Sequence, residues 1–301
     1  MKDTSKSFVH VAIAVASWST VASAFKIGLR HYSYYELLLV AALSALVILS
    51  VVISIQRKWN LLKTISRKEW LLFAFTGLLN PAGYYLILFK AYDLLPAQIA
   101  QSINYSWAIV LTLLLAVFMQ QRIPALKFLG MAISLSGVAL ISLGTGSFTG
   151  SGIQLSGTGL ILAFLSAFVW ATFWILNKKS GHIDNVFALF LSFLFGSLFL
   201  LFGLLFVDVQ LVSFKGLMSG IYVGLFEMAI PFIFFGLALK KTNNPALINQ
   251  LCYLSPFISL FIIQSVLGEH IYFTTIVGLL LIIGGILFNE YGVRNRKVLH
   301  G

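Results

Sequence analysis

The sequence predicts an all-α integral membrane protein with ten transmembrane helices, arranged as two inverted five-helix repeats with both termini in the cytoplasm. Three observations lead to this prediction: long apolar stretches, a one-sided distribution of positive charge, and an approximate internal repeat. Of the 301 residues, 59% are hydrophobic and only 10% are charged, whereas a soluble domain carries about 25% charged residues. A soluble globular protein is therefore excluded.

Ten apolar stretches of about twenty residues follow one another with short polar joints between them. A bilayer core is roughly 30 Å thick, so a helix needs about 20 mostly apolar residues to cross it. Lipid offers no water to exposed backbone groups, so each stretch is expected to be helical along its whole length. The expected helices cover residues 8–28, 35–55, 70–90, 98–119, 125–143, 157–177, 186–207, 215–239, 246–267 and 271–290.

Positive charge alternates between the joints. The N-terminus, the joints after the second, fourth, sixth and eighth helices, and the C-terminus together hold 16 of the 20 Lys and Arg residues. The positive-inside bias places this side in the cytoplasm, and the protein is expected as a multi-pass component of the inner (cytoplasmic) membrane. The net charge of +11 is explained by these topology anchors, so no nucleic-acid partner is expected.

The two sets of five helices are similar to each other in sequence. An odd number of helices per repeat requires the second copy to lie inverted in the membrane. The repeats are expected at residues 1–146 and 157–301, joined by a glycine-rich linker at 147–156. The matched pairs are Trp18 and Trp170, Gly77 and Gly224, Pro96 and Pro245, Gln101 and Gln250, Ser106 and Ser255, Gly130 and Gly278, and Gly137 and Gly285.

One ionisable side chain, Glu227, lies near the middle of an expected helix. Charged groups in a spanning segment cost about 2.5 to 3.5 kcal/mol on insertion scales, so Glu227 is a functional candidate. Pro231 removes the backbone donor for the Glu227 carbonyl and weakens the helix there. Asn80, next to Pro81, is its counterpart, and paired broken helices are typical of midplane sites in inverted-repeat transporters. Glu227 is expected to bind a proton or a substrate ammonium group; the alternative is a protonated Glu that only helps packing.

Amide and aromatic side chains are the remaining site candidates. Amides suit a neutral or zwitterionic ligand, although they also bridge membrane helices. Trp at membrane ends is usually interfacial, but Trp18 and Trp170 lie deeper, which leaves cavity lining open for them. The candidate substrate-binding residues are Trp18, Asn80, Tyr84, Gln101, Asn104, Trp107, Trp170, Trp174, Glu227, Asn249, Gln250 and Tyr253.

Signatures of other function classes are missing from the sequence. It contains no Walker A loop, no paired His ligands and no nucleophile elbow, and Cys252 is its single cysteine. No enzymatic activity, cofactor or metal is therefore expected, although an intramembrane lipid-modifying enzyme or a polytopic scaffold is kept as the alternative. Glycines at seven-residue spacing in 125–143 and 271–290 indicate close helix packing and leave a homodimer open.

Several short motifs carry a family resemblance that covers nearly the whole chain. They are Trp18-Ser19-Thr20, the Pro-Ala pairs that begin at Pro96 and Pro245, Ser255-Pro256, and Leu267-Gly268-Glu269-His270. With these motifs the chain resembles the EamA-type permeases of the drug/metabolite transporter (DMT) superfamily. Gln121 stands where the family has Glu. The resemblance implies that helices one, three, four, six, eight and nine surround a central cavity, with helices five and ten packed outside.

One segment resembles a narrower branch of that superfamily. Ile103-Asn104-Tyr105-Ser106-Trp107, together with Asn177-Lys178, is similar to the aromatic amino-acid exporters, although Ala108 replaces the Pro that usually follows the Trp. The sequence therefore predicts a secondary active or facilitative transporter of a small polar metabolite, with export of an amino acid by alternating access favoured. Glu227 is the candidate for proton coupling, and uptake or exchange of other metabolites stays open. The expected partners are the small-molecule substrate and the lipid bilayer.

Overall fold

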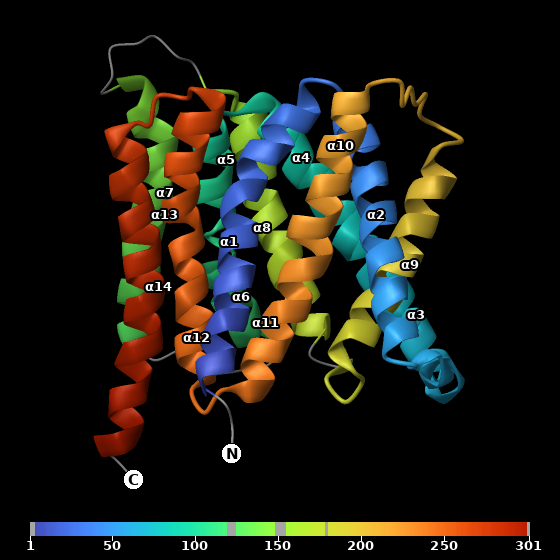
Figure 1. Ribbon diagram of the computed structural model, residues 1–301. Coiled ribbons are helices and arrows are strands. Elements are labelled where there is room, and N and C mark those ends of the chain that lie inside the picture. Colours follow the sequence, from blue (N-terminus) through green and yellow to red (C-terminus); the bar gives the residue numbers. More distant parts are fainter. Residues whose placement is uncertain (1–3, 119–124, 148–154, 178–179, 300–301) are drawn as a thin grey trace.

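A computed structural model describes residues 4–118, 125–147, 155–177 and 180–299. These residues form helices and connecting loops without a β-strand. The helices run side by side in one bundle, and α1 begins and α14 ends at the same end of it (Figure 1). This end, which holds Lys58, Lys63 and Lys240, is called the basic end below. The opposite end, which holds Arg30 and Asp93, is called the far end.

Six long helices of the described chain are uninterrupted. One of them, α2 (Tyr34–Ile55), begins at a capping box. In this capping box, Ser33 Oγ accepts from the Glu36 backbone N–H at 3.3 Å, and the Ser33 N–H donates to Glu36 Oε2 at 2.8 Å. A short 3₁₀ helix, η1 (Trp59–Thr64), follows α2. The six helices are α1 (Thr4–Leu29), α2 (Tyr34–Ile55), α7 (Ala125–Ser147), α8 (Gly157–Asn177), α9 (Asn185–Gly203) and α14 (Phe273–Leu299).

Two expected helices with a central proline, the third and the eighth, are interrupted in the middle by π-helical segments. In the first, η2 (Leu78–Gly83) joins α3 (Arg67–Gly77) to α4 (Tyr84–Leu94), and in the second, η4 (Gly224–Ala229) joins α10 (Phe214–Val223) to α11 (Ile230–Lys241). Asn80 has an extended backbone (φ −146°, ψ 117°), as a residue before proline prefers. Pro231 has no N–H for the Glu227 carbonyl, so the regular hydrogen-bond ladder stops beside this carboxylate.

The fourth and ninth expected helices are also broken, which the sequence did not predict. The fourth consists of α5 (Ala97–Asn104) and α6 (Trp107–Phe118), with a tight turn in which the Ser106 N–H donates to the Ile103 carbonyl at 3.0 Å. The ninth consists of α12 (Pro245–Leu251), η5 (Cys252–Leu254), α13 (Ser255–Ile262) and η6 (Ile263–Leu267). Pro256 explains the second break, because it cannot donate to the Cys252 carbonyl.

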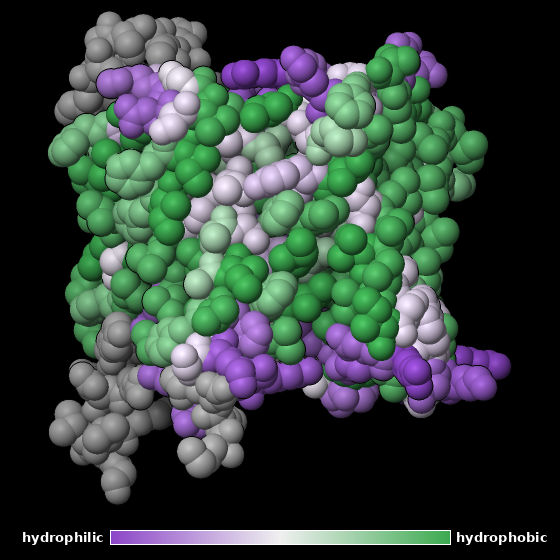
Figure 2. All heavy atoms as spheres, viewed as in Figure 1, coloured by the Kyte–Doolittle hydropathy of each residue, from purple (hydrophilic) through white to green (hydrophobic). Residues whose placement is uncertain are grey.

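The helices are suited to a membrane. Seven helical stretches of the described chain are long and apolar enough to cross a bilayer, and two shorter apolar helices cover Leu126–Ser142 and Phe273–Asn289. Apolar side chains cover the middle of the visible face, and hydrophilic residues gather toward both ends (Figure 2). The fold is that of an all-helical integral membrane protein, whereas ten crossings and a cytoplasmic position of both termini stay predictions.

Helices α7 and α14 form a closely packed pair at one edge of the bundle (Figure 1). Small residues allow this approach: a Cβ on Gly137 would contact the Gly278 carbonyl, and one on Gly285 would contact the Gly130 carbonyl. The glycines at seven-residue spacing therefore pack within the chain, and a homodimer stays a prediction. The division into repeats is likewise untested, and residues 148–154 of the expected linker lie outside the described chain.

Candidate functional site

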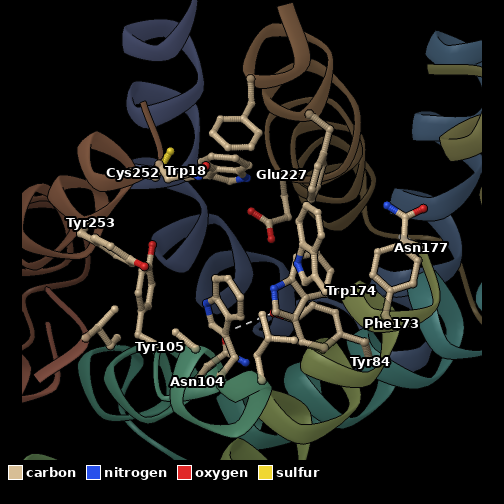
Figure 3. A pocket seen from close by; sticks show the side chains of 18 of the residues that line it. Trp18, Tyr84, Asn104, Tyr105, Phe173, Trp174, Asn177, Glu227, Cys252 and Tyr253 are labelled. Carbon is tan, nitrogen blue, oxygen red and sulfur yellow. Dashed lines mark hydrogen bonds between the residues drawn. The ribbon is translucent and has the colours of Figure 1, made fainter. Parts of the chain in front are cut away.

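A cavity of about 870 Å³ lies between the helices. Its lining includes side chains from α1, α4, α5, α6, α8, η4 and α12, and Figure 3 shows several of them pointing toward one another. Most candidate residues from the sequence meet here: Trp18, Tyr84, Gln101, Asn104, Trp107, Trp170, Trp174, Glu227, Asn249 and Tyr253.

Two candidates, Asn80 and Gln250, are not among the lining residues. Asn80 is 1% exposed, and its Oδ1 has no hydrogen-bond partner among the described residues. It was expected at the site as the counterpart of Glu227 next to a proline, but its extended backbone departs from regular helical geometry and it does not line the cavity. One turn earlier, the Thr76 hydroxyl lies 3.0 Å from Ser192 Oγ of α9.

Glu227 supplies the carboxylate of the cavity. It lies on η4, is half-buried, and points between Trp18 and Trp174 in Figure 3. The Tyr85 hydroxyl donates to Glu227 Oε1 at 3.0 Å. Single-turn π-helical segments often occur at functional sites because they re-aim side chains. Here the segment turns the carboxylate into the cavity.

Aromatic rings form a continuous wall of the cavity. Tyr84 and Trp170 stack with their centroids 4.6 Å apart. Phe232 lies 6.0 Å from Trp170 and 5.6 Å, edge-on, from Trp18. Trp174 is T-shaped to Trp170 at 6.0 Å. The deep Trp18 and Trp170 therefore line the cavity rather than form an interfacial belt.

The amides act partly as cavity lining and partly as helix contacts. Asn104 Oδ1 accepts from the Tyr84 hydroxyl at 3.2 Å, drawn as a dashed line in Figure 3, and its Nδ2 donates to Ser166 Oγ at 2.9 Å. Asn104 therefore bridges α4 and α8 and also lines the cavity, while its contact with a substrate stays a prediction. Gln101 is 5% exposed, and its Oε1 lacks a partner within the described chain. Among the residues that the structure describes, no cluster of three His, Cys, Asp or Glu side chains could hold a metal ion.

The cavity reaches toward the basic end through residues that sequence reasoning did not count as part of a site. They are Lys127, Asn177, Asn185 and Lys240, which lie at or near helix ends, and Asn289, which lies within α14. Lys127 lies on α7 and Asn289 on α14, which are the fifth and tenth expected helices. The resemblance implied that these two helices pack outside the cavity. The two lysines were interpreted as topology anchors, and Asn177 was singled out through its part in the motif shared with the aromatic amino-acid exporters.

An ion-pair cluster joins three helices at the basic end. Lys58 Nζ lies 2.8 Å and Lys240 Nζ 3.6 Å from Asp184 Oδ2, while Asp184 Oδ1 accepts from the first backbone N–H groups of α9. Burial raises the pKa of the Asp184 carboxyl, but the hydrogen bonds from Lys58 and the Phe187 N–H and the nearby positive charges lower it more. The pKa therefore lies below its ordinary value.

At the far end, aromatic and polar contacts join α1 to the end of α4. Phe25 and Tyr92 both line the cavity and pack edge-on at 5.1 Å. Lys26 Nζ donates to the Tyr92 carbonyl at 2.8 Å and the Leu95 carbonyl at 3.0 Å. A cation is well placed at these carbonyls because they end a helix.

A second set of contacts ties the first turn of α5 to the loop at 268–272. Gln98 is 1% exposed; its Nε2 donates to the His270 carbonyl at 2.8 Å, and its Oε1 accepts from the Tyr272 N–H at 3.0 Å. The Ala97 N–H donates to Glu269 Oε1 at 3.1 Å. These bonds join parts of the chain more than 170 residues apart, so no local sequence pattern predicts them.

Comparison with known proteins identifies the family. The sequence model of the EamA-like transporter family matches residues 6–143 and 157–291. The chain belongs to the EamA-like transporter family. This membership places it in the DMT superfamily and supports membrane transport as its function class. It favours a transporter over the lipid-modifying enzyme that the sequence had kept as an alternative.

Individual EamA-like relatives are distant. The chain is 25% identical over 292 residues to the uncharacterized transporter YdfC of Bacillus subtilis (strain 168), covering 95% of this chain and 92% of YdfC. It is 24% identical over 228 residues to YvbV of the same organism, also described as an uncharacterized transporter, covering 73% and 72%. A solved crystal structure of a protein aligns over 97% of this chain and 99% of its own, with a TM-score of 0.66 and 18% identity, which shows the shared fold.

Proposed function

We propose that this EamA-like protein is a secondary transporter that exports a small polar metabolite, in the first place an amino acid, by alternating access. The observation that carries the proposal is the cavity of about 870 Å³, which combines one carboxylate, several amides and an aromatic wall. Ligand sites commonly have volumes of about 300 to 1,000 Å³ and mostly apolar walls with a few polar groups. An amino acid fits this volume and this mixture of groups.

The chemistry of the lining supports a zwitterionic substrate. Glu227 can accept hydrogen bonds from a substrate ammonium group, and amide groups of the lining can donate to a carboxylate. The aromatic wall between these groups can contact an apolar side chain. The substrate would then lie along the cavity with its ammonium group deepest.

The two ends of the bundle differ as alternating access requires. The cavity reaches the basic end, whereas Gln98, Lys26 and Glu269 make hydrogen bonds that cover it at the far end. If the basic end faces the cytoplasm, as charge distribution predicts, the described conformation would load substrate from the cytoplasm. Release would require these far-end contacts to separate.

Reconstituted protein tests the proposal. Purified protein in liposomes would be screened for uptake and counterflow of labelled amino acids, with empty liposomes as the control. We expect saturable counterflow of at least one amino acid. Absence of transport for every amino acid, nucleoside and organic acid tested under an imposed gradient would overturn the proposal.

The same assay separates modes of coupling. Proton coupling is assigned to Glu227, so an imposed pH gradient is expected to drive accumulation of substrate. Facilitated diffusion would give equilibration without accumulation, and obligatory exchange would require substrate on both sides of the membrane. Either result would remove proton coupling from the proposal.

A further inference from the structure

The carboxylate in the cavity lacks a cationic partner. Within the described ranges, no Lys, Arg or His side chain forms an ion pair with Glu227, and the Tyr85 hydroxyl is its hydrogen-bonding side-chain contact. Lys240, a cation that also lines the cavity, lies roughly 20 Å away along the helix, at 1.5 Å per residue. A charge enclosed among helices without a partner is costly, so a ligand cation would be strongly stabilised there.

Aromatic rings surround the same place. Trp18, Tyr84, Trp170 and Phe232 line the cavity together with Glu227 and contact one another in series. An ammonium group within about 6 Å of such rings is attracted by their negative faces, and the attraction grows when water is excluded. A ligand carboxylate at this position would be repelled by the rings and by Glu227 alike.

The inner cavity offers unused hydrogen-bond acceptors to a ligand, beside one unused donor, the Trp174 Nε1–H, which has no partner among the described residues. Glu227 is acceptor-only when ionised, and the buried Oε1 of Gln101, on a residue that lines the cavity, has no donor in the described part of the chain. The donors of Asn104 are partly committed, since its Nδ2 bonds Ser166. A primary ammonium group carries three donors and no acceptor, which matches this set.

From these contacts we infer that the part of the cavity around Glu227 is an ammonium-binding site that does not require a carboxylate on its ligand. The substrate class would then include primary amines with an aromatic or apolar body, and not amino acids alone. This inference rests on the proposed function, because it treats the cavity as the transport site. Glu227 is the residue that selects for positive charge, and the rings around it select for the apolar body (Figure 3).

Three ligands with the same body test the inference. Phenethylamine carries the ammonium group alone, phenylalanine carries both charged groups, and 3-phenylpropionate carries the carboxylate alone. Binding to the purified full-length protein in detergent would be measured by isothermal titration calorimetry at pH 8. We expect phenethylamine to bind at least as tightly as phenylalanine and 3-phenylpropionate to bind at least tenfold more weakly. Equal binding of phenethylamine and 3-phenylpropionate, or no binding of phenethylamine, would overturn the inference.

Variants locate the site. Glu227→Gln should weaken phenethylamine binding at least tenfold, while Glu227→Asp keeps the charge and should retain part of it. Asp208→Asn, which removes an exposed carboxylate, is the matched control and should bind as the native protein does. If Glu227→Gln fails to fold, Tyr84→Leu tests the aromatic wall instead, again with loss of phenethylamine binding expected. Unchanged binding in the folded variant would contradict the inference.

Counterflow in liposomes separates this inference from the proposed function. If labelled phenylalanine is transported but phenethylamine neither binds nor competes, the ammonium site is wrong and the proposed function stands. If phenethylamine binds through Glu227 but no metabolite is transported, the ammonium site stands and the proposed function is wrong.

Discussion

At the scale of a single residue, Glu227 shows how the free-energy cost of an ionisable group within a membrane helix can indicate function. An ionisable group inside a helical membrane bundle is expensive, and within the described part of the chain this one has a tyrosine hydroxyl and a cavity beside it rather than a counter-ion. The sequence could identify it because insertion cost depends on residue type and position alone. Asn80 was chosen as the counterpart of Glu227 next to a proline, but with the extended backbone of η2 it is not part of the cavity lining.

Replacing Glu227 with Gln should abolish the pH dependence of transport. Gln keeps the size of the side chain and an acceptor for the Tyr85 hydroxyl but cannot exchange a proton. Counterflow and gradient-driven uptake would be measured in liposomes between pH 6 and 8, with Asp208→Asn as the control for a general loss of charge. An unchanged pH profile in Glu227→Gln would remove this residue from coupling.

Asp184 makes a prediction about stability. The pKa of its carboxyl in the folded protein lies below the ordinary value, so its ionised form stabilises the fold above about pH 4 and this contribution is lost as the pH falls further. Asp184→Asn keeps a helix-capping side chain but not the charge. The variant should therefore unfold at a lower temperature than the native protein at pH 7, and the difference should shrink toward pH 3. Thermal unfolding in detergent checks this, and a difference independent of pH would contradict it.

At the scale of helices, close packing in a membrane depends on small residues, because lipid gives no hydrophobic advantage to larger ones. Helices α7 and α14 are held together in this way, and Ser134 Oγ donates to the Ile282 carbonyl at 2.9 Å across the pair. The seven-residue spacing of the glycines can be seen in the sequence. The sequence does not show whether these glycines pack against a second copy of the protein or against a helix of the same chain. Contacts between positions almost 150 residues apart decide that question.

Two neighbouring glycines of α14 provide a matched pair of variants. A Cβ on Gly285 would lie 2.9 Å from the Ser134 backbone N and would also contact the Gly130 carbonyl, whereas a Cβ on Gly284 meets nothing within 4 Å. Gly285→Ala should destabilise the protein by about 1–3 kcal/mol through overpacking. Gly284→Ala should be neutral or slightly stabilising, since Ala is the better helix former. Thermal unfolding of both variants in detergent tests the pair, and equal effects would contradict this packing.

Some of the helix interruptions could be predicted from the sequence and others could not. Pro81 and Pro231 predicted weak points in two helices, and π-helical segments occur at both. The break at Tyr105 and Ser106 has no proline and lies in an apolar run of ordinary length, so hydropathy alone predicted one continuous helix at 98–119. Two of the cavity residues, Asn104 and Trp107, flank that break.

At the scale of the whole molecule, the direction of the cavity depends on pairings that no local pattern encodes. The sequence predicted helices, a basic side and a cavity between the halves, but the closing contacts of Gln98 and Lys26 are made with backbone groups. Almost every residue carries the same backbone donor and acceptor, so residue type does not reveal which backbone group a side chain will bond. These contacts could therefore be found only from the three-dimensional arrangement.

The single cysteine of the chain, Cys252, offers a test of that state because it lines the cavity. A membrane-impermeant thiol reagent would be applied separately to each face of oriented vesicles, and the rate of labelling measured. The native protein should react from the side of the basic end and little from the far end. Gln98→Ala removes two hydrogen bonds worth about 1 kcal/mol each, so it should raise far-side labelling by roughly tenfold or more.

Gln264→Ala is a suitable control for Gln98→Ala, since Gln264 is exposed near the same end of the bundle. It should leave the labelling rates of both faces unchanged. Rapid labelling of native Cys252 from the far side would mean that the contacts around Gln98 do not close the cavity. If far-side labelling does not change in Gln98→Ala, the side chain only packs the loop at 268–272, and opening at this end depends on other groups. An increase limited to Gln98→Ala would instead identify the junction of α5 with this loop as a part that moves when the cavity opens outward.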